Sequence, residues 1–487
     1  MEAAGLWMLG IVAVTMIATG LPAWVLLIGV ALLFAIVGIA GGVFSLPLLS
    51  AIPSRLLGLL DNDLLQALPL YVFMGALLNR LPLAEILLRT GARALAWTGC
   101  GVPLAGLGLG VILAPMNGSV GAGVAMLART LQPRLDASGM PPERSAALVC
   151  MSSTLGVVIP PSLVLILLGD AMLRAHTEAV NAFGGRMVGE GRIINTQDVF
   201  HGALIPATIL LVLCIAVTWW MSRRRAGQST QSVAVPITLQ TTRGDWITAV
   251  MTTLIVVTLL GGVVLGYLYA VEAAATGGVA LFAFGLASRT LTRETLKAAL
   301  RDTIVVSGAL FALLIAATVF TLIIRAFGTD RWLAALLANI GGGAYGALFV
   351  VLLILGVSAL VLDAFEMIFV VIPLVIPPLL LRVPDATWVA VLTLLMLQTS
   401  FLVPPFGYAV LMVRNRTARH LSGGALTKAL LPYLLVQLFV FALVLLFPNI
   451  VWHDTPVAIP QTAPAPVPSD DVLRDMLNKQ LGEQKSD

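Results

Sequence analysis

Long stretches without a charged residue occupy most of this chain, and they constrain its fold more than any other feature. A helix needs roughly 20 apolar residues to cross a bilayer, and only helices and closed barrels satisfy every backbone polar group there. The charge-free stretches are residues 3–54, 64–79, 94–128, 145–169, 202–222, 246–271, 303–324, 332–362, 386–413 and 429–453. The first is long enough for two helices, broken near Gly20-Leu21-Pro22. We predict an all-α polytopic membrane protein with about eleven to thirteen transmembrane helices.

The composition excludes a soluble or a disordered chain. Only 11% of the residues are charged and 59% are hydrophobic, whereas a soluble domain carries about 25% charged residues. The three cysteines lie in apolar runs and the four histidines lie far apart, so neither disulfides nor a transition-metal site is indicated. The net charge of +4 comes without a basic stripe containing aromatic residues, and it fits basic cytoplasmic loops better than a nucleic-acid partner.

Signatures of catalysis are also missing from the sequence. It has no Gly-x-x-x-x-Gly-Lys-Ser/Thr loop for ATP, no HExxH motif and no Gly-x-Ser-x-Gly elbow. We therefore expect no enzymatic activity and no cofactor. No Lys or Arg precedes the first apolar run, so we do not expect a cleaved signal peptide.

The two halves of the chain resemble each other at a constant offset. Pro160-Pro161 lies in STLGVVIPPSLVLILLG and Pro404-Pro405 lies in LQTSFLVPPFGYAVLMV, 244 residues later. The same offset places Pro133 on Pro377 and Ser119 on Asp363. A Pro-Pro pair can occur twice by chance among 27 prolines, but the surrounding hydropathy also matches. Repeated halves with interrupted helices are typical of secondary transporters, which bind substrate and coupling ions where the repeats meet.

The segment APMNGSVGAGVA (114–125) predicts a re-entrant hairpin. Gly, Asn and Ser disfavour a straight helix, and the stretch 94–128 is too short for two full crossings. A turn at Asn117-Gly118-Ser119 would direct free carbonyl and side-chain oxygens into a cavity, as a dehydrated Na⁺ requires. The alternative is that the small residues form a helix-packing face.

The Pro-Pro pairs predict breaks within two other spans. Pro160 and Pro161 remove two backbone donors and leave carbonyls of the preceding turn without partners. In a bilayer such carbonyls need a side chain, water or an ion. Polar or small residues flank both breaks: Thr154, Gly156 and Ser162 in the first half, and Gln398, Thr399 and Ser400 before Pro404 and Pro405 in the second. The alternative is a proline kink whose carbonyls are satisfied by adjacent helices.

Asp363 and Glu366 are the only charged residues between Arg331 and Arg382. Carboxylates at membrane depth cost about 2.5–3.5 kcal/mol and are candidates for function. The pair could coordinate a cation or relay protons. The alternative is that Asp363 caps a helix at the membrane surface.

The chain divides into four parts on this reading. Residues 1–222 form a first repeat half with a hairpin around 94–130 and a broken helix at 145–169. Residues 223–245 form a polar loop, cytoplasmic because of its arginines. Residues 246–453 form a second half with a hairpin around 344–381 and a broken helix at 386–413. Residues 454–487, rich in Pro and then polar, form a flexible tail.

Five segments resemble the large membrane subunit of tripartite ATP-independent periplasmic (TRAP) transporters. They are GSVGAGVAML (118–127), STLGVVIPPSLVLILLGD (153–170), DVFHGALIPATIL (198–210), VLDAFEMIFVVIPLVIPP (361–378) and LQTSFLVPPFGYAVLM (397–412). The similarity extends from Leu6 to about Phe447. The last two segments look most like the subgroup for mannitol, chloroaromatic or 2-oxo acid uptake.

The resemblance implies a bacterial inner-membrane, Na⁺-coupled importer of a small organic acid. It implies an elevator mechanism, with scaffold and transport domains built from inverted repeats. It further implies two partners, a small four-helix membrane subunit and a periplasmic substrate-binding protein, in addition to membrane lipid. A rival interpretation is an anion carrier that needs no binding protein.

Carried onto this chain, the resemblance implies where Na⁺ and the substrate bind. The Na⁺ ligands are Asn117, Gly118, Ser119, Thr154, Gly156, Asp363, Thr399 and Ser400, and Na⁺ is the only metal expected. The substrate ligands are Ser119, Ser162, Glu366 and Gln398. The family has a pair of small hydroxyl residues at the first hairpin tip, where this chain has Ser119-Val120.

Overall fold

The computed structural model describes residues 4–60, 63–113, 120–160, 162–182, 193–226, 241–405, 407–416 and 421–452. The regular elements in these ranges are all helices, which confirms the predicted all-α class. The predicted hairpin tip Asn117-Gly118-Ser119, Pro161 and the tail 454–487 lie outside the described residues.

The first half of the chain forms eleven α-helices within the described ranges. They are α1 (Ala4–Thr19), α2 (Ala23–Ala40), α3 (Ala51–Leu60), α4 (Asp63–Arg80), α5 (Leu83–Ala94), α6 (Gly101–Leu113), α7 (Val120–Thr130), α8 (Gln132–Ala137), α9 (Pro142–Val158), α10 (Leu163–Ala182) and α11 (Thr196–Ala226). Short 3₁₀ turns at Leu46–Ser50 and Ala96–Thr98 join some of them.

The second half repeats this pattern. Its helices are α12 (Arg243–Val264), α13 (Ala270–Ala287), α14 (Arg293–Ala326), α15 (Thr329–Asn339), α16 (Gly343–Ser358), α17 (Ala364–Glu366), α18 (Ile372–Leu380), α19 (Ala386–Ser400), α20 (Tyr408–Arg416) and α21 (Gly423–Leu446). A π-helical turn at Met367–Val371 joins α17 to α18, and a 3₁₀ turn at Pro448–Ile450 follows α21.

Several helices are apolar and long enough to cross a membrane. Within the described residues six qualify by length and composition, and two bent pairs raise this to eight. Five shorter apolar helices of 10–17 residues accompany them, including α6, α16 and α19. The predicted break in the first stretch is confirmed, because α1 ends at Thr19 and α2 begins at Ala23. The number of crossings, eleven to thirteen, stays a prediction.

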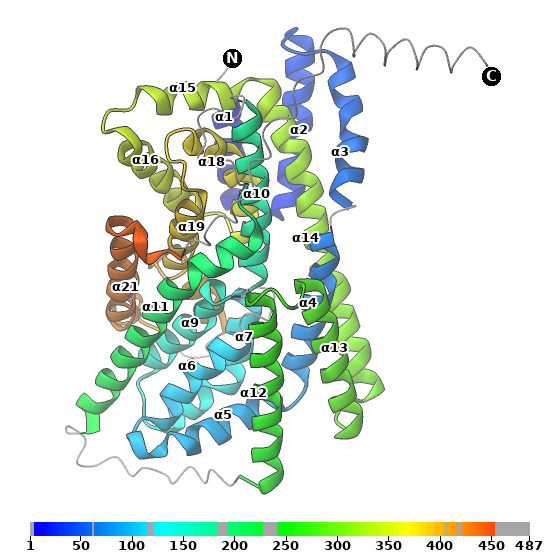
Figure 1. Cartoon of the computed structure of the whole chain (residues 1–487). Coiled ribbons are helices and arrows are strands. Elements are labelled where there is room, and N and C mark those ends of the chain that lie inside the picture. The colour runs from blue at the N-terminus through cyan, green and yellow to red at the C-terminus, as the bar shows by residue number, and fades with distance from the viewer. Residues whose placement is uncertain are drawn as a thin grey trace, which may run out of the picture. The chain divides into compact units, whose positions relative to one another are not determined.

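Helix starts in the two halves keep the offset of 244 residues. Helix α9 begins at Pro142 and α19 begins at Ala386, 244 residues later. Figure 1 shows α5 lying crosswise at the lower end and α15 lying crosswise at the upper end, as equivalent elements of inverted repeats would. The division of the chain into two related halves stays a prediction.

The predicted polar loop 223–245 is shortened by helix at both ends. Helix α11 continues through Ala226, and α12 already begins at Arg243. The early start of α12 follows from reciprocal capping: the Thr242 N–H donates to Asp245 Oδ2 at 2.8 Å, and the Asp245 N–H donates to Thr242 Oγ1 at 3.2 Å.

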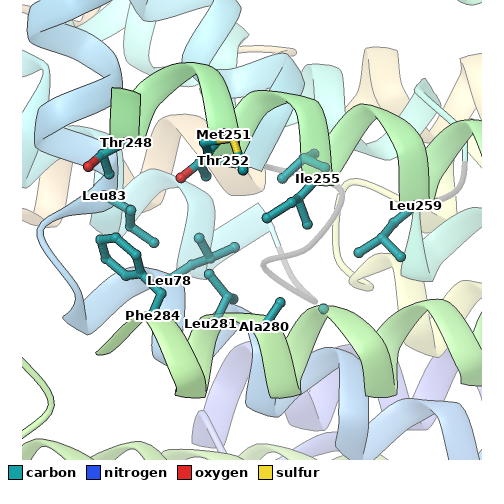
Figure 2. Close-up of a pocket in the computed structure, with 12 residues that line it drawn as sticks. Leu78, Leu83, Thr248, Met251, Thr252, Ile255, Leu259, Ala280, Leu281 and Phe284 are labelled. Atoms are coloured by element: carbon teal, nitrogen blue, oxygen red, sulfur yellow. The ribbon is translucent and has the colours of Figure 1, made fainter. Parts of the chain in front are cut away.

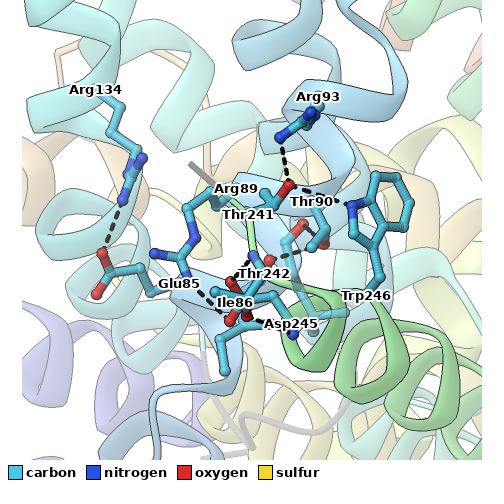
Figure 3. A network of polar contacts seen from close by, with 11 residues as sticks. Glu85, Ile86, Arg89, Thr90, Arg93, Arg134, Thr241, Thr242, Asp245 and Trp246 are labelled. Atoms are coloured by element: carbon cyan, nitrogen blue, oxygen red, sulfur yellow. Dashed lines mark hydrogen bonds and ion pairs between the residues drawn. The ribbon is translucent and has the colours of Figure 1, made fainter. Parts of the chain in front are cut away.

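The start of α12 is tied to the crosswise helix α5 by polar contacts (Figure 3). Arg89 pairs with Asp245 at 2.9 Å, and Arg93 donates to Thr241 Oγ1 at 2.7 Å. On the other side of α5, Glu85 pairs with Arg134 of α8 at 2.8 Å. Helix α5 thus links the start of the second half to the first hairpin region.

Burial identifies α9 and α19 as the central helices. Every residue of α9 from Ser145 to Val158 is buried, as is almost every residue of α19. Helix α12, in contrast, exposes large apolar side chains such as Ile247, Val250 and Leu254. A helix that is apolar and exposed in this way suits contact with lipid. The two helices with Pro-Pro breaks are therefore the ones most enclosed by protein.

Candidate transport site at the two helix breaks

The two central helices touch through residues at equivalent positions. Gln398 Nε2 of α19 donates a hydrogen bond to Thr154 Oγ1 of α9 at 3.3 Å, across 244 residues. Both side chains are fully buried. When equivalent residues of two related halves contact each other, they lie close to the axis that relates the halves. The contact therefore brings two predicted site residues together at the centre of the repeat.

The first break lies where α9 gives way to α10. Helix α9 ends at Val158, Ile159 is extended, and the segments Pro142–Val158 and Leu163–Asn181 are bent by 40°. Ser162 spans this break: its Oγ donates to the Val157 carbonyl at 2.8 Å and accepts from the Leu165 N–H at 3.1 Å. The Ser162 hydroxyl thus satisfies a carbonyl released by the break and caps the start of α10.

The second break follows α19, which ends at Ser400 before Pro404 and Pro405. Helix α20 begins at Tyr408. Thr399 Oγ1 donates to the Leu395 carbonyl and Ser400 Oγ to the Met396 carbonyl, both at 2.8 Å. Because these hydroxyls use their protons within the helix, their oxygens remain acceptors. They suit a cation.

Some buried oxygens near the contact have no partner among the described residues. Gln398 Oε1 is one, and Ser152 Oγ and Thr393 Oγ1 are others on the same two helices. Buried polar atoms in folded proteins are nearly always hydrogen-bonded or bound to an ion or water. The Gln398 carbonyl oxygen is therefore available to a ligand.

The two acidic residues lie on the second hairpin. Asp363 precedes α17 as its N-cap, and Glu366 Oε2 accepts a hydrogen bond from the Asp363 backbone N–H at 3.0 Å. Both side chains are half-buried. The hairpin packs against α10 and α19. This geometry matches the alternative that Asp363 caps a helix, and it leaves the predicted Na⁺ role open. Within the described residues, no group of three His, Cys, Asp or Glu side chains could hold a metal.

The helix that follows the first hairpin tip reaches both broken helices. A Cβ atom on Gly123 would lie 3.4 Å from Ser153 Cβ of α9, and one on Gly121 would lie 3.0 Å from Tyr408 Oη of α20. Small residues thus let α7 pack closely on both helices, most tightly at Gly121. Helices α7, α9, α19 and α20 thus bring together the described residues predicted for the site, except Ser162, Asp363 and Glu366.

Residues 9–450 match the family described as "Tripartite ATP-independent periplasmic transporter, DctM component". The chain belongs to this family. The TRAP family is one of transport proteins, and the chain is accordingly a multi-pass inner-membrane permease subunit and not an enzyme.

Curated relatives of this TRAP permease are similar over most of their length. The C4-dicarboxylate TRAP transporter large permease protein DctM of Rhodobacter capsulatus is 22% identical, over 79% of this chain and 85% of the relative. The 2,3-diketo-L-gulonate TRAP transporter large permease protein YiaN of Escherichia coli K12 is 22% identical, over 89% and 95%. The sialic acid TRAP transporter large permease protein SiaM of Vibrio cholerae is 21% identical, over 88% and 93%.

A solved structure shares the fold. The YdaH transporter of Alcanivorax borkumensis aligns with a TM-score of 0.58 at 15% identity, covering 83% of this chain and 89% of that one. The likeness supports a polytopic fold with broken and re-entrant helices. Identities near 22% do not resolve a subgroup within the TRAP family.

The sequence analysis missed Gln437, a buried amide on α21. Its Nε2 donates to Met151 Sδ of α9 at 3.7 Å, and its Oε1 has no partner among the described residues. The signal was an amide in the middle of the charge-free stretch 429–453. Gln437 therefore extends the polar surroundings of α9 one turn from Thr154.

An apolar pocket of about 70 Å³ between α12 and α13 does not belong to this site. Figure 2 shows its wall of aliphatic and aromatic side chains, among them Met251, Leu281 and Phe284. It offers no charged group to an organic anion. Its position beside the exposed α12 suits a lipid chain better.

Proposed function

We propose that this permease takes up a small organic anion, such as a 2-oxo or hydroxy acid, together with Na⁺. The uptake would proceed by an elevator movement, with a small four-helix subunit and a periplasmic binding protein as partners. The observation that carries the proposal is the meeting of two broken helices at Thr154 and Gln398, deep in protein. The relatives' names, which mention C4-dicarboxylates, sialic acid and diketogulonate, support an organic acid. The subgroup for mannitol, chloroaromatic or 2-oxo acids remains part of the proposal.

Helix ends at the breaks supply the electrostatics that Na⁺ needs. A helix C-terminus carries partial negative charge on free carbonyls, and α9 and α19 both end at the breaks, at Val158 and Ser400. The oxygens of Thr154, Thr399 and Ser400 and the backbone at Gly156 add to this. We assign Na⁺ to these ends, with Asp363 and the first tip completing the coordination.

Helix starts supply the complement for the anion. The N-terminus of α10 presents N–H groups, which favour a carboxylate. We assign the substrate to the space served by Ser119, Ser162 and Gln398. The Ser119 hydroxyl and the second N–H of the Gln398 amide can donate to it, whereas the Ser162 hydroxyl gives its proton to Val157. Glu366 would accept a hydrogen bond from a substrate hydroxyl.

The Na⁺ part is tested by thermal unfolding of the purified permease in NaCl and in KCl at equal ionic strength. A ligand that binds only the folded state at a hundredfold excess over its Kd stabilises it by about 2.7 kcal/mol. We expect a higher midpoint in NaCl, reduced in Asp363→Asn and unchanged in Glu294→Gln, an acid at the start of α14. Equal midpoints in the two salts would contradict Na⁺ binding by this chain.

The uptake part is tested in proteoliposomes that contain both membrane subunits. Labelled organic acids, beginning with a C4-dicarboxylate, are supplied with and without the binding protein under an inward Na⁺ gradient. We expect uptake only when the Na⁺ gradient and the binding protein are both present. Equal uptake without the binding protein would favour the binding-protein-independent carrier.

A further inference from the structure

A charged cavity of about 290 Å³ lies apart from the helix breaks. Its walls come from α3, α10, α14 and the second hairpin. The charged side chains among its described lining residues are Arg55, Asp170, Arg174, Glu178 and Arg325. Small-molecule sites occupy roughly 300–1,000 Å³, so the cavity suits a ligand at the small end of that range.

Four of the five charges pair with each other. Arg174 Nε lies 3.0 Å from Asp170 Oδ2, one helical turn away. Both terminal nitrogens of Arg325 contact Glu178, each at 2.7 Å. Among the residues that the structure describes, Arg55 has no ion-pair partner. Among the described residues that line the cavity, three side chains are basic and two are acidic, and Arg55 lies at the exposed rim.

The paired arginines are held in place by further contacts. Arg325 also donates to the Pro373 carbonyl of the second hairpin at 3.1 Å. An arginine fixed in this way presents its remaining N–H groups in a set direction. A guanidinium matches a carboxylate with two parallel hydrogen bonds. Arg325 already makes this pairing with Glu178, so the guanidinium left for an added small carboxylate is that of Arg55.

The cavity adjoins the proposed transport site through the chain itself. Ile368 and Phe369, which line it, follow Glu366 on the second hairpin, and Leu167 lies just over one turn after Ser162 on α10. Two of its walls therefore continue into elements that carry predicted substrate ligands.

The cavity lies at the end of the protein opposite the predicted cytoplasmic loop 223–245. Arg325 is near the C-terminal end of α14, next to the crosswise α15, whereas the predicted cytoplasmic loop leads into α12 beside α5. Figure 1 shows α5 and α15 at opposite ends. With the loop 223–245 on the cytoplasmic side, the cavity is on the periplasmic side.

We propose that this cavity is an entry site that binds the organic anion before it reaches the helix breaks, with Arg55 as its direct ligand. The inference rests on the proposed function for the identity of the anion. A basic surface at the mouth of a site raises the local concentration of anions and speeds their entry.

The charge of the cavity is measured with a cysteine at Gly58, which lines it. A Cβ at this position meets no atom within 4 Å, and the native Cys100, Cys150 and Cys214 are buried. Gly58→Cys is reacted with an anionic and a cationic methanethiosulfonate of similar size. We expect faster reaction with the anionic reagent, and a several-fold fall in the anionic-to-cationic ratio in Arg55→Gln.

Controls separate the cavity from general charge effects. Arg293→Gln removes an arginine at the opposite end of α14 and should leave the ratio unchanged. Thr318→Cys, on the α14 wall, repeats the measurement if Gly58→Cys does not fold. Succinate should slow the labelling in the parent and not in Arg55→Gln. A ratio near one, or no protection by succinate, would overturn the proposal.

These measurements need neither Na⁺ nor transport. A charge-neutral cavity with an intact Na⁺-dependent midpoint would refute the entry site alone. An anion-selective cavity in a protein without Na⁺-driven uptake would refute the proposed function alone.

Discussion

The two hairpins carry different side chains at equivalent positions. At the first pair of equivalent positions, the first half has Ser119 and the second half has Asp363. Three residues later, Ala122 corresponds to Glu366. The broken helices that follow nevertheless start in the same register, at Pro142 and Ala386. The backbone is repeated while the chemistry is not, so the formal negative charge of the pair of hairpins is concentrated in the second.

The hairpins also pack differently on their broken helices. Gly110 of α6 lies against the backbone carbonyl of Ser152 on α9, whereas Gly356 of α16 lies against the terminal methyl of Met396 on α19. Ser152 and Met396 are equivalent positions, 244 residues apart. The first hairpin thus packs backbone to backbone, and the second packs through a flexible side chain.

The largest expected difference concerns ion dependence. Asp363→Asn should raise the Na⁺ concentration for half-maximal uptake by about tenfold or more, because an interaction with a charged group contributes roughly 1.5–3 kcal/mol. Ser119→Ala should raise it only about two- to tenfold, since a neutral hydrogen bond contributes about 0.5–1.5 kcal/mol. Uptake by proteoliposomes at varied Na⁺ and constant ionic strength measures both. Equal effects of the two substitutions would show that the negative charge of Asp363 contributes no more to Na⁺ binding than the hydroxyl of Ser119 does.

A methyl group added at a packing glycine should reduce stability more in the first hairpin than in the second, which is the reverse of the order expected for ion dependence. Gly110→Ala should destabilise the protein by about 1–3 kcal/mol, because the new methyl overlaps a backbone carbonyl that can move only with its helix. Gly356→Ala should cost less than about 1 kcal/mol, because the Met396 side chain can turn away. Thermal unfolding in detergent compares the two. A larger loss at Gly356 would mean that the second hairpin is the rigid one.

The smallest effect is expected at the contact between the halves. In a double-mutant cycle of Thr154→Val and Gln398→Leu, the coupling in unfolding free energy should be about 0.6 kcal/mol, the average for hydrogen bonds between membrane helices. A coupling of zero would indicate that the two side chains do not interact in the folded protein.

The sequence was sufficient for the helix breaks and the repeat. Prolines and glycines act locally, so Gly20-Leu21-Pro22, Pro160 and Pro404 could be assigned without tertiary information. The equivalence of Thr154 and Gln398 also followed from the offset alone.

The remaining features depend on which distant helices meet. Nothing local shows that Arg325 pairs with Glu178, 147 residues away, or that Arg55 joins them at one cavity. Ser162 was assigned to substrate because it is polar beside a break, yet its hydroxyl bonds across that break to Val157. Such partners become visible only in three dimensions.

Two identical halves related by a twofold axis contact each other on that axis through the same residue of each half. That residue must therefore be able to pair with a second copy of itself. Once both halves belong to one chain, each copy can change alone. Here one copy is a hydroxyl, Thr154, and the other is an amide, Gln398, which donates to it and keeps an oxygen to spare. Thr154 and Gln398 thus form an asymmetric pair at positions where two identical halves would place the same residue twice. An anion bound together with a cation is itself asymmetric. At the asymmetric Thr154–Gln398 contact it would bind in one preferred orientation, and not in two equivalent ones.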